Sequence, residues 1–245
     1  MKKFIIKITS LIFWIAIWQI LYNWVDAKFL IASPFDVGIN IYSLLLKPET
    51  WSLIVHTTLR IMIGFIFASC VGILLGTISY VLCFLKELID VLISIIKIAP
   101  IVSFIIFALV YMETVFVVPF ISFLMVLPIF YYATYESLTN IDKKMIEMAN
   151  MYEYSFLSKV KYIYLNESKK NLLSEIESGI GFAFKSGITA EILVLPKESI
   201  GMMLYNSKIY LDGLSLISYT VILILISIVL EKTIKYLVKK ATKYE

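Results

Sequence analysis

Six long apolar segments, separated by shorter polar stretches, dominate the sequence. They cover residues 8–25, 54–84, 88–111, 114–134, 171–195 and 214–237. A helix that crosses the apolar core of a bilayer needs about 20 such residues, and its backbone groups are satisfied within the helix. Runs of this length do not alternate as the strands of a membrane barrel do. The pattern therefore predicts an all-α polytopic membrane protein with about six transmembrane helices.

Residues 34–48 follow Ser33 and do not fit a span. Within them Val37, Ile41, Leu44 and Leu45 fall on one helical face. This spacing predicts a short amphipathic helix that lies in the outer membrane interface.

The longest polar stretch, residues 138–168, predicts two short helices. Asn140 or Asp142 is placed to cap the first helix, and Ser155 is placed to cap a second that extends to Leu165. The first helix carries an apolar stripe made of Met145, Met148, Ala149 and Tyr152. We expect this stripe to dock, either on the chain's own helix ends and the lipid interface or in a groove of a cytoplasmic subunit.

Composition and the placement of lysine indicate the solvent and the orientation. Of the 245 residues, 60% are hydrophobic and 16% are charged, against about a quarter charged in soluble domains. With the N-terminus in the cytoplasm, fifteen basic residues fall on the cytoplasmic side and four on the outer side. This bias predicts that both termini are cytoplasmic. No small-residue cleavage pattern follows the first apolar segment, so we expect a retained helix rather than a signal peptide.

Ionisable residues inside predicted spans are costly and are therefore candidates for a pathway or for gating. Our candidates among them are Arg60, Lys97, Lys185 and Glu191. For Arg60 the alternative is a side chain that snorkels to the headgroups. Lys185 and Glu191 are six residues apart, so an i,i+4 pair between them is not expected.

Prolines and glycines mark where helices break or approach closely. Pro100, Pro119 and Pro128 fall inside predicted spans, where a proline frees a carbonyl and kinks the helix, and such breaks often line cavities. Small residues recur at helical spacing around Gly64, Gly72, Gly76 and Gly187. They predict close helix packing, either within the subunit or at a pathway or subunit interface.

Several kinds of chemistry are not expected of this chain. His56 is the sole histidine, we identify no paired-acid catalytic motif in a span, and no cluster has the spacing of metal ligands. No glycine-rich phosphate loop is present. We therefore expect no catalytic group, no bound metal, no cofactor on the chain itself and no nucleic-acid partner. An intramembrane enzyme and a membrane scaffold remain the alternatives to a transporter.

Four stretches are similar to known sequence motifs. Phe29 to Val37 is similar to LPSP-x-x-V, and Thr58 to Phe65 with Gly72 and Gly76 is similar to S-L-R-x-x-x-G-F and G-x-x-x-G. Ile98 to Ile101 is similar to R-P-I-P-P, and Ala190 to Leu193 with Gly201 is similar to A-E-M-L and G-L-G. Through these motifs the chain resembles binding-protein-dependent ABC importer permeases of the nitrate, sulfonate, taurine and bicarbonate type. The resemblance covers residues 29–237.

The cytoplasmic stretch also resembles the EAA loop of these permeases, E-A-A-x-x-L-G-A-S-x-x-x-x-F-x-x-V-x-L-P. With Glu147 at the first position, the register continues without a gap to Leu165. Glu153 then stands at the loop's glycine and Asn166 at its final proline. The resemblance implies that this loop contacts an ATPase through Glu147, Met148, Ala149, Tyr152, Glu153 and Ser155.

The resemblance implies a type I ABC importer permease-like fold, with residues 1–245 as one transmembrane permease domain. It also implies the partners: ATPase subunits that bind the ATP, a second permease copy in a homodimer, an extracytoplasmic substrate-binding protein and membrane lipid. The location would be the cell (inner or plasma) membrane. If Lys97 and Lys185 face the pathway, simple attraction favours an anion such as a sulfonate or nitrate. A molecule that resembles a vitamin precursor is the other candidate.

Overall fold

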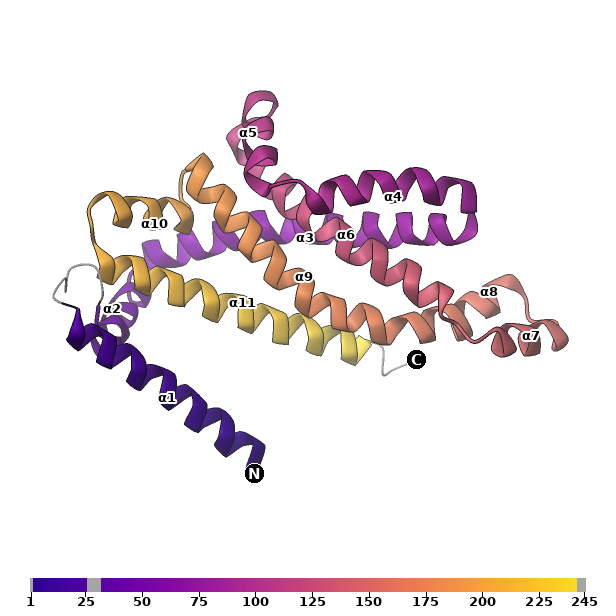
Figure 1. The fold of residues 1–245 in the computed structure, drawn as a ribbon, viewed down its shortest axis with the longest axis horizontal. Coiled ribbons are helices and arrows are strands. Elements are labelled where there is room, and N and C mark those ends of the chain that lie inside the picture. Colours follow the sequence, from indigo (N-terminus) through magenta and orange to yellow (C-terminus); the bar gives the residue numbers. More distant parts are fainter. Residues whose placement is uncertain (1, 26–31, 242–245) are drawn as a thin grey trace. The chain divides into compact units, whose positions relative to one another are not determined.

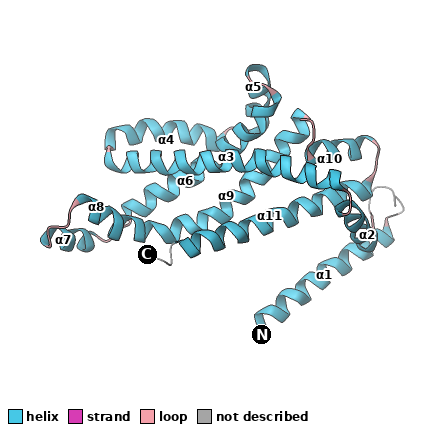
Figure 2. Ribbon diagram, turned by 180° about the vertical axis from the view of Figure 1, so that it is seen from behind, coloured by secondary structure: helices cyan, strands magenta, loops and turns pink. Residues whose placement is uncertain are grey.

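The computed structural model describes residues 2–25 and 32–241, and every element in these ranges is a helix (Figures 1 and 2). The elements are α1 (Lys2–Trp24), α2 (Pro34–Leu45), α3 (Pro48–Val81), α4 (Cys83–Ile98), α5 (Ile101–Tyr111), α6 (Thr114–Thr139), α7 (Lys143–Met151), α8 (Phe156–Lys159), the π-helix η1 (Val160–Tyr164), α9 (Leu165–Val194), α10 (Ile200–Ile209) and α11 (Gly213–Ala241). The predicted all-α class is confirmed.

The chain forms two compact units. The first contains Met1–Thr57 and Leu195–Ile226, and the second contains Thr58–Val194 and Ser227–Glu245. The divisions fall inside the long helices α3 and α11 and at the end of α9.

Among the described residues, three helices are long and apolar enough to cross a membrane: α3, α6 and the Gly213–Leu237 part of α11. A fourth candidate is the pair α4 and α5, which is bent by 101° at its break. The predicted segments 8–25 and 171–195 are helical up to Trp24 in α1 and Val194 in α9, and their spanning stays a prediction.

The interruption predicted at Pro100 is confirmed, because the helix of segment 88–111 breaks at Ala99 and Pro100. Ala99 has φ −65° and ψ 141°, an extended conformation. A residue before proline is driven into this region by clash with the proline ring. The kinks expected at Pro119 and Pro128 do not interrupt α6, which continues through both.

In the second unit, glycines let α3 lie directly against α6. A Cβ atom built on Gly64 would lie 2.2 Å from the carbonyl oxygen of Pro119, and one on Gly76 would lie 2.8 Å from that of Tyr131. Gly72 makes a similar approach one turn earlier. Because backbone atoms cannot move aside as side-chain ends do, any larger residue would push the helices apart.

Helix α9 uses a glycine in the same way. A Cβ atom on Gly187 would lie 2.5 Å from Ile61 Cγ1 and 2.8 Å from Ser122 Oγ. These neighbours belong to α3 and α6, so the three helices meet at this point. Figure 1 shows α6 and α9 running side by side through the unit.

In the first unit, the short helix expected over residues 34–48 is present as α2. The backbone N–H of Asp36 donates to Ser33 Oγ at 3.1 Å, which caps the helix, and Pro34 occupies its first position. Asn40 Nδ2 donates to Ser218 Oγ of α11 at 3.0 Å. The start of α2 was therefore predictable from the sequence, whereas its contact with α11 was not.

Candidate functional site

Helix α7 forms the first half of the 138–168 loop and is anchored by one small residue. Its N-cap is Asp142, whose Oδ1 accepts a hydrogen bond from the backbone N–H of Lys144 at 2.9 Å. Ala149 is only 2% exposed. It packs in an apolar cluster with Leu138, Ile141 and Ile163. α7 is thus held to the end of α6 and to η1.

The opposite side of α7 is open. Met148 is 52% exposed and Tyr152 74% exposed, and Glu147 and Ser155 are also exposed. The expected single docking stripe is therefore wrong in part, because Ala149 turns toward the chain's own core while Met148 and Tyr152 face outward. Large apolar side chains at an exposed helix end are typical of a protein contact surface.

A Schellman motif ends α7. The N–H of Tyr154 donates to the carbonyl of Ala149 at 2.9 Å, and that of Glu153 donates to Asn150 at 3.1 Å. Glu153 has φ 52°, in the left-handed region that this motif requires. Glu153 stands where the similar loops have glycine. The backbone here therefore has the left-handed conformation that glycine adopts easily, although the residue at this position carries a side chain.

The second half of the loop differs from the expectation. Ser155 accepts a hydrogen bond from the N–H of Ser158 at 3.3 Å and starts α8, as predicted. The helix does not end at Leu165, however, since it continues through the π-helical turn η1 into α9. Asn166, at the position of the motif's proline, keeps a backbone N–H and does not force an end there. Lys159 Nζ donates to Asn150 Oδ1 at 2.6 Å and ties α8 to α7.

Two of the predicted ionisable candidates pair with each other. Arg60 Nη1 of α3 lies 3.5 Å from Glu191 Oε1 of α9, with the Arg60 side chain 17% exposed and that of Glu191 fully buried. Arg60 therefore contacts the Glu191 carboxylate within its own unit, so snorkelling to the headgroups is not its sole interaction. The pair lies in the packing of two helices and is not part of the lining of the cavity described next.

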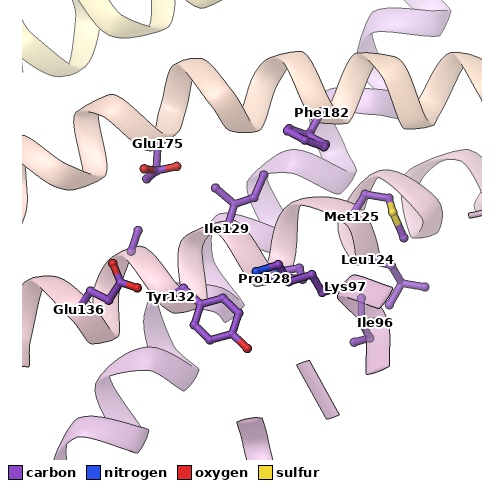
Figure 3. A pocket seen from close by; sticks show the side chains of 11 residues that line it. Ile96, Lys97, Leu124, Met125, Pro128, Ile129, Tyr132, Glu136, Glu175 and Phe182 are labelled. Carbon is purple, nitrogen blue, oxygen red and sulfur yellow. The ribbon is translucent and has the colours of Figure 1, made fainter. Parts of the chain in front are cut away.

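Lys97 lines a cavity of about 480 Å³ between α4, α6 and α9 (Figure 3). Its Nζ lies 5.2 Å from the centroid of the Tyr132 ring, a cation–π contact. The cavity, here called the α4–α6–α9 cavity, is lined by Ile96, Lys97, Leu124, Met125, Pro128, Ile129, Tyr132, Ala133, Glu136, Glu175 and Phe182. Pro100 and Lys185 are not among these residues, and Lys185 is exposed elsewhere on α9.

Two carboxylates in this cavity were missed by the sequence analysis. Glu136 extends from α6 and Glu175 from α9 into the same space (Figure 3). The helical spacing of the sequence could have indicated them, since Glu136 is four residues after Tyr132 and Glu175 is seven residues before Phe182. These spacings put each acid on one helical face with an aromatic residue.

A second polar cluster ties α4 to α6. The Tyr131 hydroxyl donates to Asp90 Oδ1 at 2.5 Å and lies 3.1 Å from Ser79 Oγ. Lys86 Nζ lies 3.5 Å from Asp90 Oδ2. Tyr131 is fully buried, so this cluster positions α4 on the bundle.

A family model described as binding-protein-dependent transport system inner membrane component matches residues 68–243. The match contains the α4–α6–α9 cavity, the 138–168 loop and all of α9. No curated protein matches the chain.

Proposed function

Because the chain belongs to the family of binding-protein-dependent transport system inner membrane components, we propose that its α7–α8 turn couples an ATPase to solute movement through the membrane. The family makes the chain a multi-pass permease subunit of an ABC importer, which works with ATPase subunits and a substrate-binding protein. Such subunits are not enzymes, and the ATP is bound by the partner.

The Schellman motif at Glu153 carries the coupling proposal. It reproduces the turn that a glycine would form in the resembling EAA loop, and it ends the helix on which Glu147, Met148 and Tyr152 are exposed. The buried Ala149 and the continuous helix from α8 to α9 connect this surface to the bundle. A displacement of α7 by the ATPase would therefore be transmitted directly to α9, which lines the α4–α6–α9 cavity.

The remaining parts of the proposal concern assembly and orientation. A second copy of the chain completes the pathway, with lipid around the bundle, and both termini lie in the cytoplasm. The support for this orientation is the lysine bias, which puts the 138–168 loop on the ATPase side. The α4–α6–α9 cavity is the part of the pathway that we assign to this chain.

The solute is small, and its class depends on which charges face the pathway. The expectation of an anion, such as a sulfonate or nitrate, depended on both Lys97 and Lys185 facing the pathway. In the structure Lys97 lines the cavity and Lys185 does not. A neutral or cationic molecule, including one that resembles a vitamin precursor, is compatible with this arrangement.

Co-purification tests the coupling proposal. The chain is solubilised from its native membrane, and the ATPase recovered with it is quantified by mass spectrometry. Met148→Ala with Tyr152→Ala should reduce the recovered ATPase, because truncating a central contact costs about 2 kcal/mol, roughly 30-fold in affinity. The amount of chain in the membrane should not change.

The control for this experiment is Tyr210→Ala. Tyr210 is 80% exposed at the end of α10, so it matches Tyr152 in type and exposure but lies in the other unit. It should leave ATPase recovery unchanged. Equal recovery from all variants would show that α7 is not the coupling surface, and an absence of ATPase from the unaltered chain would refute the whole assignment.

A further inference from the structure

The two carboxylates of the α4–α6–α9 cavity lie within about one helical turn of each other along the bundle. Asn171 Nδ2 of α9 donates to Ser137 Oγ of α6 at 3.1 Å. Two turns later, a Cβ atom on Gly179 would lie 3.1 Å from Phe130 Cε2 of α6. Glu175 falls midway between these contacts, level with Ala133 and Thr134 of α6, so it lies within about one helical turn of Glu136 along the bundle, toward the end of the cavity that leads to α7.

These acids are not neutralised by the cation of the same cavity. Among the side chains that the structure describes, no ion pair within 4 Å joins Lys97 to Glu136 or Glu175. By contrast, Glu177 pairs with Lys235 of α11. With formal charges, the lining carries two negative groups and one positive group. A net negative cleft with low-dielectric walls concentrates cations and repels anions.

The rest of the cavity is apolar and aromatic. Glu136 and Leu124 are twelve residues apart on α6, so the lining extends over about 18 Å of helix. Phe182 and the Tyr132 ring lie between these ends (Figure 3). Aromatic faces attract cations, as Lys97 already shows by its position over Tyr132.

We propose that the α4–α6–α9 cavity accepts a small organic solute with a positively charged, ammonium-type group, which Glu136 and Glu175 bind while the aromatic part of the cavity holds its apolar body. This inference rests on the proposed function, since it names the substrate class of the same pathway. It replaces the anionic class that the sequence suggested, because one lysine of the two is absent from the lining and two acids are present.

Charged thiol reagents test the sign of the charge without a known substrate. Cys70 and Cys83 are free and exposed, so both are first replaced by serine. Ile129→Cys then puts a thiol in the cavity of the solubilised complex. We would measure how fast this thiol reacts with two methanethiosulfonate reagents, one that carries a trimethylammonium group and one that carries a sulfonate group. The same two rates are measured for Tyr210→Cys, which lies outside the cavity. The cationic reagent should be favoured about tenfold more at position 129 than at position 210.

Charge variants test which residues of the cavity cause the preference for the cationic reagent. Glu136→Gln with Glu175→Gln should abolish the preference, and Lys97→Gln should increase it. Met125→Cys provides a second position in case Ile129→Cys does not fold. Equal or faster reaction of the sulfonate reagent would overturn the proposal. The proposal would also be overturned if the cavity thiols at positions 129 and 125 reacted with neither reagent, because the cavity would then be covered by lipid or by a second copy.

The ATPase co-purification is run on the same preparations, so that the two proposals can fail separately. If the ATPase is recovered but the cationic preference is absent, the substrate class is wrong and the permease mechanism stands. If the preference is present without an ATPase, the cavity binds cations but the coupling assignment fails.

Discussion

Arg60 and Glu191 form an ion pair between α3 and α9, with 3.5 Å between Nη1 and Oε1. The residues are 131 positions apart, and the Glu191 carboxylate is fully buried. Taking a carboxylate into an apolar interior is costly unless a cation compensates it. Each residue is a candidate for the pathway or for gating, and their mutual contact also makes them part of the packing between α3 and α9.

Removing one member of this pair should destabilise the chain strongly. Glu191→Gln leaves the Arg60 guanidinium without its carboxylate, and breaking a buried pair costs about 3–5 kcal/mol. The melting temperature of the solubilised chain should fall accordingly. The double variant Arg60→Met with Glu191→Met should recover most of that loss. A Glu191→Gln variant with unchanged melting but abolished transport would instead support a gating role.

The glycine contacts between α3 and α6 predict a contrast between two small substitutions. Gly64→Ala should lower the stability by about 1–3 kcal/mol, because the new Cβ meets the Pro119 carbonyl oxygen at 2.2 Å. Gly181→Ala is the control, since nothing lies within 4 Å of its Cβ. In a helix interior it should stabilise by up to about 1 kcal/mol. Thermal melting in detergent checks both, and equal effects would contradict the close approach of α3 to α6.

Much of the local structure was predictable because its causes are local. Ser33 and Pro34 define the start of α2, Pro100 breaks the helix at Ala99, and Asp142 caps α7. In each case, a side chain or ring acts on the backbone within a few residues. The left-handed turn at Glu153 was also predictable, although only through the resemblance of its loop to one that has glycine there.

The contacts that define the site could not be predicted in this way. Glu136 and Glu175 come together because α6 and α9 pack side by side, and nothing near either residue encodes that packing. Arg60 selects Glu191 for the same reason. The continuation of α8 into α9 was missed because a capped polar stretch and an apolar span looked like separate helices, whereas the π-helical turn joins them.

The polar cluster of α4 predicts a specific role for one hydroxyl group. Tyr131→Phe removes the donor that Asp90 accepts from at 2.5 Å and should destabilise by about 1.5–3 kcal/mol, the range for hydrogen bonds to charged groups. Tyr111→Phe, at an exposed helix end, should have little effect. If both variants melt at the same temperature as the unaltered chain, this hydrogen bond does not hold α4 to α6.

The turn after α7 yields the prediction that bears most directly on coupling. Glu153 has φ 52°, which a residue with a Cβ adopts at a cost that glycine avoids. Glu153→Gly should therefore stabilise the turn by about 1 kcal/mol and slow hydrogen exchange of the Tyr154 amide, which donates to Ala149. Glu147→Gly, in the exposed interior of α7, should act in the opposite direction by a similar amount. Because an ordered α7 presents Met148 and Tyr152 in one geometry, the Glu153→Gly chain should also retain its ATPase at least as well as the unaltered chain. Faster exchange at Tyr154 in Glu153→Gly would show that the left-handed turn is not the stable end of this helix.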